Sequence, residues 1–494
     1  MKRITTAIFA ICVYFAPPSY LQAQESSWTQ QSVKEEFRYF GLEDREKDVV
    51  PETSVSDLEQ KEESKQEAND TYGVDNMYAA SAIPPTQKRI SNLEDVPEQG
   101  QPAVKASDLD LDAIKENFLI FGNITALGSY SALINNSSIT GGNVSGYLAP
   151  AYKISEKMFF IFLMNGMYNK SKQVYVQDDG PRLSTETRSY SITPTLKYSL
   201  SETLSISPSL IYTKSQARQD GTVRWGDDLY DYTEIGGSMV LEASLTNTDE
   251  VKRNISLTAQ GYHRNYPNYT SLLTLAGFGS LEEREKDFDG FLAMAGYTVS
   301  RPLGLSYKLN GNVLYKKFSD KLVENESGER NNYKQKDMVV TLGTNLDYKP
   351  MDSTSLLLDL TYIYNWSNQN LSTGTFPANE YTRNYHIYHN LIISPGVEHT
   401  MQVIGRDLIL KGQYSYSVTQ YTGRNAKSDA GVIVGKEKDF THELSFNATF
   451  KFNKELDFLL SSNVQRVRSN MKEETTFRYN YSLFNFSLGL SYSF

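Results

Sequence analysis

The stretch from Tyr190 to Leu200 reads YSITPTLKYSL, and apolar and polar residues alternate along its whole length. Side chains of a β-strand point alternately to opposite faces, so this segment presents one apolar face and one polar face. A helix would instead repeat its apolar residues every three or four positions. The stretch therefore predicts a strand that has an apolar environment on one side only.

The same two-residue period recurs from Phe118 to the end of the chain, most clearly in LSFNATFKFN from Leu444 to Asn453. Further examples are Leu204 to Tyr212, Leu303 to Val313 and Leu408 to Val418. A soluble sandwich would contain strands that are apolar on both faces, because a second sheet covers the first. Here the polar face is Ser, Thr, Asn and Lys almost everywhere, which favours a closed membrane barrel with lipid outside and a polar interior.

The breaks between these segments alternate in length. Short polar breaks fall at Ser155 to Lys157, Ser201 to Thr203, Thr248 to Val251, Arg301 to Leu303, Pro350 to Ser353, Thr400 to Arg406 and Asn453 to Glu455. Longer polar stretches lie between most of them, at Gln216 to Asp231, Lys321 to Tyr333, Gln369 to Thr382 and Gly423 to Glu437. Short turns at one end and long loops at the other are typical of outer-membrane barrels.

Seven short turns join fourteen strands, from Val144 to Ile154 before the first turn to Leu456 to Arg468 after the last. Phe118 to Ala132 and Thr476 to Phe494 add one strand at each end. We therefore predict an all-β fold, a transmembrane antiparallel up-and-down barrel of about sixteen strands over residues 117–494. Fourteen strands is the alternative, because the first pair alternates less cleanly. An even count places both ends of the barrel on the short-turn, periplasmic side.

Residues 1–23 have the features of a secretory signal peptide. Lys2 and Arg3 precede an apolar stretch from Ala7 to Ala16, and a small-residue cleavage site follows at Leu21 to Ala23. The apolar stretch is too short to span a bilayer. The only cysteine of the chain, Cys12, lies within it, so the mature protein has no disulfide and no cysteine nucleophile. We expect an exported protein of the cell outer membrane.

Residues 24–116 differ in kind from the rest of the chain. They contain 22 acidic and 10 basic residues and few apolar ones, so they cannot bury enough surface to offset chain entropy. We predict an acidic, mostly disordered periplasmic tail. Phe37, Phe40 and Leu42 lie close together in it; they are either part of an idle linker or a motif that folds on binding a periplasmic protein.

The last strand carries the most specific motif. Phe484, Phe486, Leu488, Leu490, Tyr492 and the terminal Phe494 share one face and alternate with Ser, Asn and Gly. This pattern resembles the C-terminal β-signal of bacterial outer-membrane β-barrel proteins, among them the porins. The resemblance covers only this strand and implies recognition by the barrel-assembly machinery and insertion among outer-membrane lipids.

Sequence motifs for catalysis or cofactor binding are lacking. His386 and His389 are three residues apart, which would place them on opposite faces of a strand, and we find no motif of an outer-membrane phospholipase or protease. We therefore expect no enzyme activity, no cofactor and no metal site. A net charge of −10 gives no basis for a nucleic-acid partner.

Two functions fit these features. In the first, the barrel is a passive channel for small solutes, with Lys197, Lys308, Lys411 and Lys451 among its lumen-lining side chains. Residues 117–494 contain 37 acidic and 37 basic residues, which predicts weak ion selectivity. The loop from Thr270 to Leu281 is apolar, with Leu272, Leu273, Leu275 and Phe278, and either folds into the lumen as a constriction, contacts a partner, or extends its strands. In the second function, a non-conducting barrel anchors an envelope assembly and recruits a periplasmic partner through the acidic tail.

Overall fold

The computed structural model describes residues 117–133, 137–176, 184–219, 224–248, 250–269, 284–326, 330–373, 380–472 and 480–494. They belong to the second of the two compact units of the chain, Lys115–Phe494. The signal peptide, the acidic tail with Phe37, Phe40 and Leu42, and the loop with Leu272, Leu273, Leu275 and Phe278 lie outside the described residues. In the described part, no helix is long and apolar enough to cross a membrane.

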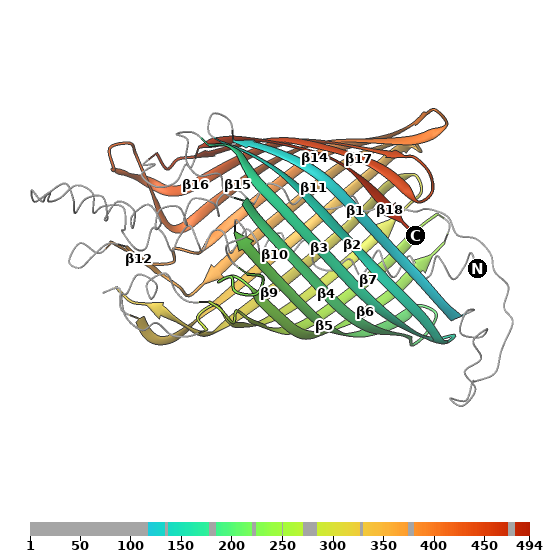
Figure 1. The fold of residues 1–494 in the computed structure, drawn as a ribbon, viewed down its shortest axis with the longest axis horizontal. Helices are drawn as coiled ribbons and strands as arrows, with labels where there is room; N and C mark the ends of the chain where they lie inside the picture. The colour runs from blue at the N-terminus through green and yellow to red at the C-terminus, as the bar shows by residue number, and fades with distance from the viewer. Residues whose placement is uncertain are drawn as a thin grey trace, which may run out of the picture. The chain divides into compact units, whose positions relative to one another are not determined.

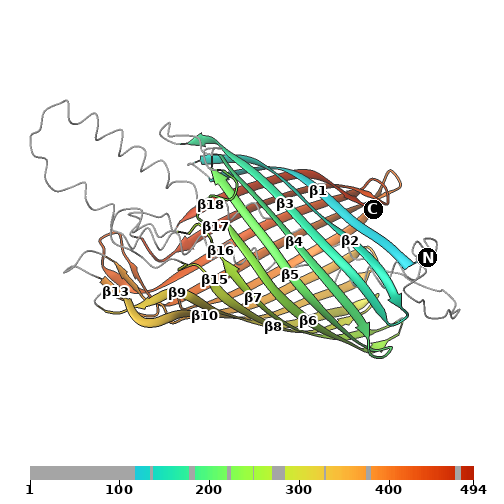
Figure 2. The same cartoon turned by 60° about the horizontal axis from the view of Figure 1, so that its bottom comes forward.

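Sixteen strands form one closed antiparallel barrel, in which each strand pairs with its neighbours in the chain and β18 closes the ring against β1 (Figures 1 and 2). The first eight are β1 (Phe118–Leu133), β2 (Ser137–Ser155), β3 (Met158–Val176), β4 (Ser184–Ser199), β5 (Leu204–Gln219), β6 (Tyr232–Asn247), β7 (Lys252–Asn265) and β8 (Phe288–Ser300). The others are β9 (Gly304–Glu324), β10 (Arg330–Met351), β11 (Thr354–Ser367), β14 (Tyr388–Val403), β15 (Arg406–Lys427), β16 (Ile433–Lys451), β17 (Leu456–Ser469) and β18 (Tyr481–Ser493). The count of sixteen is confirmed, and the alternative of fourteen is wrong.

All seven short breaks fall at turns between consecutive strands, at the end of the barrel where β1 begins and the chain ends (Figure 1). We call this end the short-turn side and the opposite end the loop side. Gly304 and Gly405 stand in two of these turns with φ of 80° and 70°, a conformation that glycine adopts without steric cost. The short turns were predictable because each concentrates polar residues between two alternating segments.

The loop side differs from the prediction in three places, one of which is the stretch from Gly423 to Glu437, where β15 continues to Lys427 and β16 begins at Ile433. The stretch from Lys321 to Tyr333 was expected to be a loop, but β9 continues to Glu324 and β10 begins at Arg330. The stretch from Gln369 to Thr382 contains a small separate hairpin, β12 (Leu371–Thr373) with β13 (Glu380–Thr382). Polar residues pair as readily as apolar ones in strands that extend beyond the membrane, so composition alone did not mark these ends.

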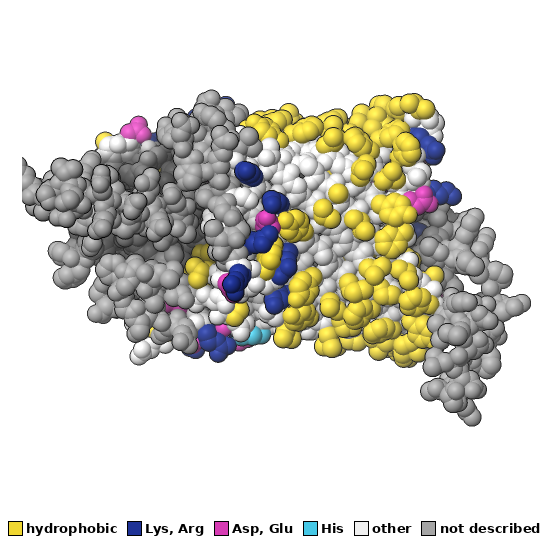
Figure 3. Space-filling model, viewed as in Figure 1, with side chains coloured by type: hydrophobic (Ala, Val, Ile, Leu, Met, Phe, Trp, Pro, Cys, Tyr) yellow, Lys and Arg dark blue, Asp and Glu magenta, His cyan; other side chains and the backbone are white. Residues whose placement is uncertain are grey.

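The outer wall carries the apolar face of nearly every strand. Leu210, Ile235 and Leu444 expose 68%, 62% and 61% of their surface, and Figure 3 shows apolar side chains spread over the wall toward the short-turn side. So much apolar surface facing water would be unfavourable, whereas lipid accommodates it in place of a protein core. The barrel is an outer-membrane barrel, and its backbone hydrogen bonds are satisfied around the ring.

Candidate functional site: the inner wall of the barrel

Alternation along each strand defines the inner wall. The cross-strand pairs keep the apolar outward residues in register, for example Leu210 opposite Gly237 and Tyr212 opposite Ile235, so the residues between them face inward. The inward residues of β4 and β18 are largely Asn, Ser and Thr, whereas on β1 and β3 such polar residues share the inner face with apolar ones such as Leu119 and Ile161. The polar residues bond to one another across strands, as in Asn123 to Ser491 at 2.9 Å and Asn165 to Ser191 at 3.1 Å. This part of the inner wall is nearly uncharged.

The four lysines named from the sequence all belong to the inward set. Lys197 Nζ lies 2.9 Å from Glu242 Oε2, and both side chains are about four-fifths buried. Lys451 Nζ lies 3.5 Å from Asp407 Oδ2, and Lys411 stands opposite Glu398 on the neighbouring strand. Lys308 faces inward on β9, opposite Asn345. The four lie toward the short-turn end of their strands, where carboxylates accompany most of them.

Two further carboxylates stand on the inner wall, on β11 and β16. Asp359 on β11 accepts hydrogen bonds from Asn345 Nδ2 at 2.7 Å and from Gln413 Nε2 at 2.8 Å. Glu443 on β16 accepts one from Asn463 Nδ2 at 2.9 Å. Neither carboxylate forms an ion pair with a described residue. Sequence reasoning named the lysines and missed these acids.

The inner wall also has an apolar row that the sequence did not predict. Leu292, Leu314 and Val339 stand side by side on β8, β9 and β10 in consecutive cross-strand pairs. They face inward, and only 2%, 4% and 6% of their surfaces are exposed. The expectation of a polar inner face almost everywhere is therefore corrected over these three strands, and also at Ala151 and Ile161 on β2 and β3, which pair on the inner face and are buried. Alternation predicts which residues share a face, but it does not predict which residues of neighbouring strands meet.

Buried arginines hold the loop-side end of the inner wall. Arg264 donates from Nε and Nη2 to Glu234 Oε2 at 3.0 and 2.7 Å, and its guanidinium lies 4.3 Å from the ring centre of Tyr232. Arg424 lies between the rings of Tyr385 and Tyr421, at 4.1 and 4.0 Å. Planar stacking on aromatic rings together with a carboxylate partner is a stable environment for a buried guanidinium. These contacts join β6 with β7, and β15 with the turn before β14.

Histidines and acidic clusters do not form a metal site in this part of the protein. Among the described residues, no group of three or more His, Cys, Asp or Glu side chains could hold a metal ion. His389 and His442 face outward and lie beside tyrosines, with Nδ1 2.7 Å from the hydroxyl oxygens of Tyr362 and Tyr414 respectively. His386 lies in the turn before β14, not on a strand.

Comparisons with known proteins add little beyond the architecture. No protein-family model matches the sequence, and no curated protein matches it at a significant level. Solved structures of similar outline include Acinetobacter baumannii OccAB1, with 9% identity, TM-score 0.42 and coverage of 76% of this chain and 96% of that one. Salmonella typhi OmpF has 11% identity and a TM-score of 0.39, with coverage of 76% of this chain and 98% of that one. Pseudomonas aeruginosa OprD has 10% identity and a TM-score of 0.38, with coverage of 76% of this chain and 94% of that one. Likeness at this level transfers neither a substrate nor a mechanism to this chain.

Proposed function

We propose that the protein is a passive channel through which small polar solutes cross the outer membrane. The observation that carries the proposal is the inner wall, where sixteen strands present hydrogen-bonded Asn, Ser, Thr and Gln side chains and a few paired charges. Barrels of about this strand number enclose an aqueous channel. A wall of short polar side chains exchanges hydrogen bonds with water and with solutes at little cost.

The arrangement of the wall supports small solutes as the cargo. Polar residues on β1, β3, β4 and β18 bond to water or to a solute hydroxyl, whereas Leu292, Leu314 and Val339 are almost fully buried and are not accessible to a solute. Charged solutes would meet acids and lysines near the short-turn end, where pairs such as Lys197 with Glu242 leave little net charge.

Single-channel recording tests the proposal. Mature protein refolded in detergent and inserted into planar bilayers should give steady, voltage-independent conductance, with and without residues 24–110. A resistance of the folded band to SDS before heating shows that the inserted protein is a barrel. Silence from a barrel shown to be folded would overturn the channel and favour the other hypothesis, an envelope anchor whose acidic tail recruits a periplasmic partner. In that case, deletion of residues 24–110 should abolish partner co-purification.

A further inference from the structure

Five cations gather on the outer wall of the barrel near the loop side. They are Lys170, Lys172, Arg188, Lys214 and Arg218, on the loop-side halves of β3, β4 and β5. They belong to the outward set, because they share the strand faces of Phe160, Tyr190 and Leu210. Figure 3 shows Lys and Arg side chains grouped on this wall beside the apolar region. We call these five residues the outer basic cluster.

One carboxylate offsets only part of this charge. Glu186 lies 2.8 Å from Lys170 Nζ and 2.6 Å from Arg218 Nη2, and it accepts a hydrogen bond from the Tyr168 hydroxyl. Its two oxygens are therefore already used. Lys172 and Lys214 form no ion pair with a described residue, and Arg188 donates to the neutral Gln216. The outer basic cluster consequently keeps three cations that no described carboxylate neutralises.

Aromatic residues mark the height of the cluster on the wall. The rings of Tyr190 and Tyr212 lie 6.2 Å apart directly on its short-turn side, and apolar outward residues such as Ile192 follow them. Trp225 covers the cluster from the other side, 4.3 Å from the Arg188 guanidinium and 4.6 Å from that of Arg218. Tyr and Trp favour the boundary between headgroups and acyl chains. The cluster thus stands at the level of lipid headgroups.

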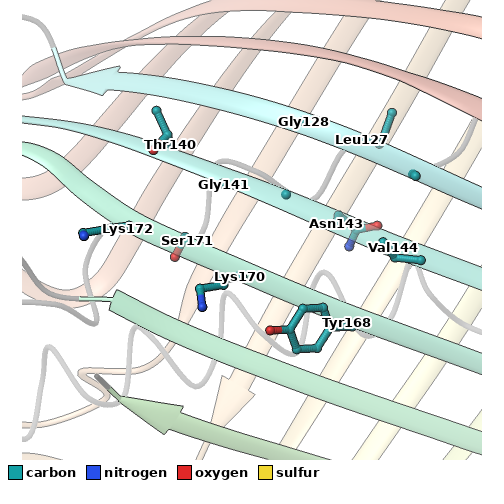
Figure 4. A pocket seen from close by; sticks show the side chains of 12 residues that line it. Leu127, Gly128, Thr140, Gly141, Asn143, Val144, Tyr168, Lys170, Ser171 and Lys172 are labelled. Carbon is teal, nitrogen blue, oxygen red and sulfur yellow. The ribbon is translucent and has the colours of Figure 1, made fainter. Parts of the chain in front are cut away.

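A groove in the outer wall begins beside the cluster. Small residues on β1 and β2 leave a hollow of about 560 Å³, with Gly128 opposite Gly142, and Ala126 opposite Val144. Tyr168, Lys170 and Lys172 on β3 form its other edge (Figure 4). The groove therefore has an uncharged, shallow floor and two ammonium groups along one side.

We propose that this wall binds one lipid of the outer leaflet that bears two phosphates, with one phosphate on Lys172, the other on Arg188 and Lys214, and an uncharged part of the lipid in the groove. Guanidinium and ammonium groups at a headgroup boundary attract anionic headgroups and hydrogen-bond to their oxygens. The loop side faces outward in barrels with short periplasmic turns, so the cluster meets the outer leaflet. A second copy of the chain would bring its own cations against these, so charge complementarity favours the lipid. The inference is independent of conduction, because lipid binding is measured without it.

The headgroup contact is tested by native mass spectrometry of the mature protein in neutral detergent, titrated with diphosphorylated lipid A. The triple variant K172Q/R188Q/K214Q keeps the Glu186 pairs and should bind about a hundredfold more weakly, at roughly 1 kcal/mol for each cation removed. The matched variant K317Q/K336Q/R466Q removes the same charge from exposed sites elsewhere on the barrel and should bind as the parent does. Equal loss in both variants, or no loss in the first, overturns the site.

Two further measurements separate the sources of binding. Inorganic phosphate at the same concentration should not displace the lipid, because it lacks the uncharged part that contacts the groove; full displacement would reduce the site to a phosphate site and overturn the lipid. Gly128→Leu fills the groove, since an added Cβ meets only one backbone oxygen at 3.9 Å, and should weaken lipid binding severalfold. Gly412→Leu, at an outward glycine with open space around it, is its control. If the parent chain forms a dimer and Gly128→Leu abolishes that dimer, the groove binds a second copy of the chain, and the lipid proposal is overturned.

Discussion

Gly122 shows how a single residue shapes the closure of the barrel. Its backbone N–H and C=O exchange hydrogen bonds with Phe494 at 3.1 and 3.0 Å, and the Phe494 ring covers its Cα. Any Cβ at this position would collide with the ring. Gly122→Val should therefore lower the free energy of unfolding by about 1–3 kcal/mol, the usual cost of overpacking, in urea titrations of the refolded protein. Gly166→Val, at an outward glycine where an added Cβ has nothing within 4 Å, should leave the free energy of unfolding unchanged. Equal losses in the two variants would mean that the loss of glycine flexibility, not contact with the Phe494 ring, causes the destabilisation.

At the scale of elements, strand identity was predictable because alternation is a local property. In Tyr190 to Leu200 and in Leu444 to Asn453, the apolar and the polar face can be identified from the segment alone. The seven short turns then indicate where consecutive strands end and begin. Two other features were not predictable, because they depend on residues that are distant in the sequence. The row of Leu292, Leu314 and Val339 forms only in the observed register of three strands. Arg424 stacks on Tyr385, which is 39 positions away. The lysines could be assigned to the inner face, but the partners that neutralise them could not.

We propose a role in assembly for the last strand, β18, in addition to closing the ring. The six outward residues expected to form the assembly signal are Phe484 to Tyr492 on β18 and Phe494 directly after it, and the ring centres of Tyr492 and Phe494 lie 6.1 Å apart. If the barrel-assembly machinery reads the terminal ring, Phe494→Ala should reduce the folded barrel recovered from cells several-fold. Phe452→Ala removes an outward ring at the short-turn end of β16 and is the matched control. The readout is the heat-modifiable band in outer-membrane fractions; equal recovery of both variants would contradict an assembly role.

At the scale of the whole barrel, residues 117–494, equal numbers of acidic and basic residues conceal an uneven distribution of charge. The outer basic cluster places cations against the headgroup region, while Asp359 and Glu443 stand on the inner wall without an ion-pair partner among the described residues. A permeating ion senses the inner wall far more strongly than charges screened outside it. Equal numbers of acidic and basic residues predicted weak ion selectivity. The position of these two acids instead predicts a modest preference for cations over anions.

The channel should accordingly prefer potassium to chloride, because two carboxylates on the inner wall attract cations and repel anions. The double variant D359N/E443Q keeps hydrogen-bonding groups at both positions and should move the reversal potential in a tenfold KCl gradient toward zero, while single-channel conductance changes less than twofold. The matched double variant E202Q/D352N removes one Glu and one Asp from exposed short turns and should leave the reversal potential as it is. A parent channel that prefers chloride would show that Asp359 and Glu443 do not govern permeation, even if conduction itself is established.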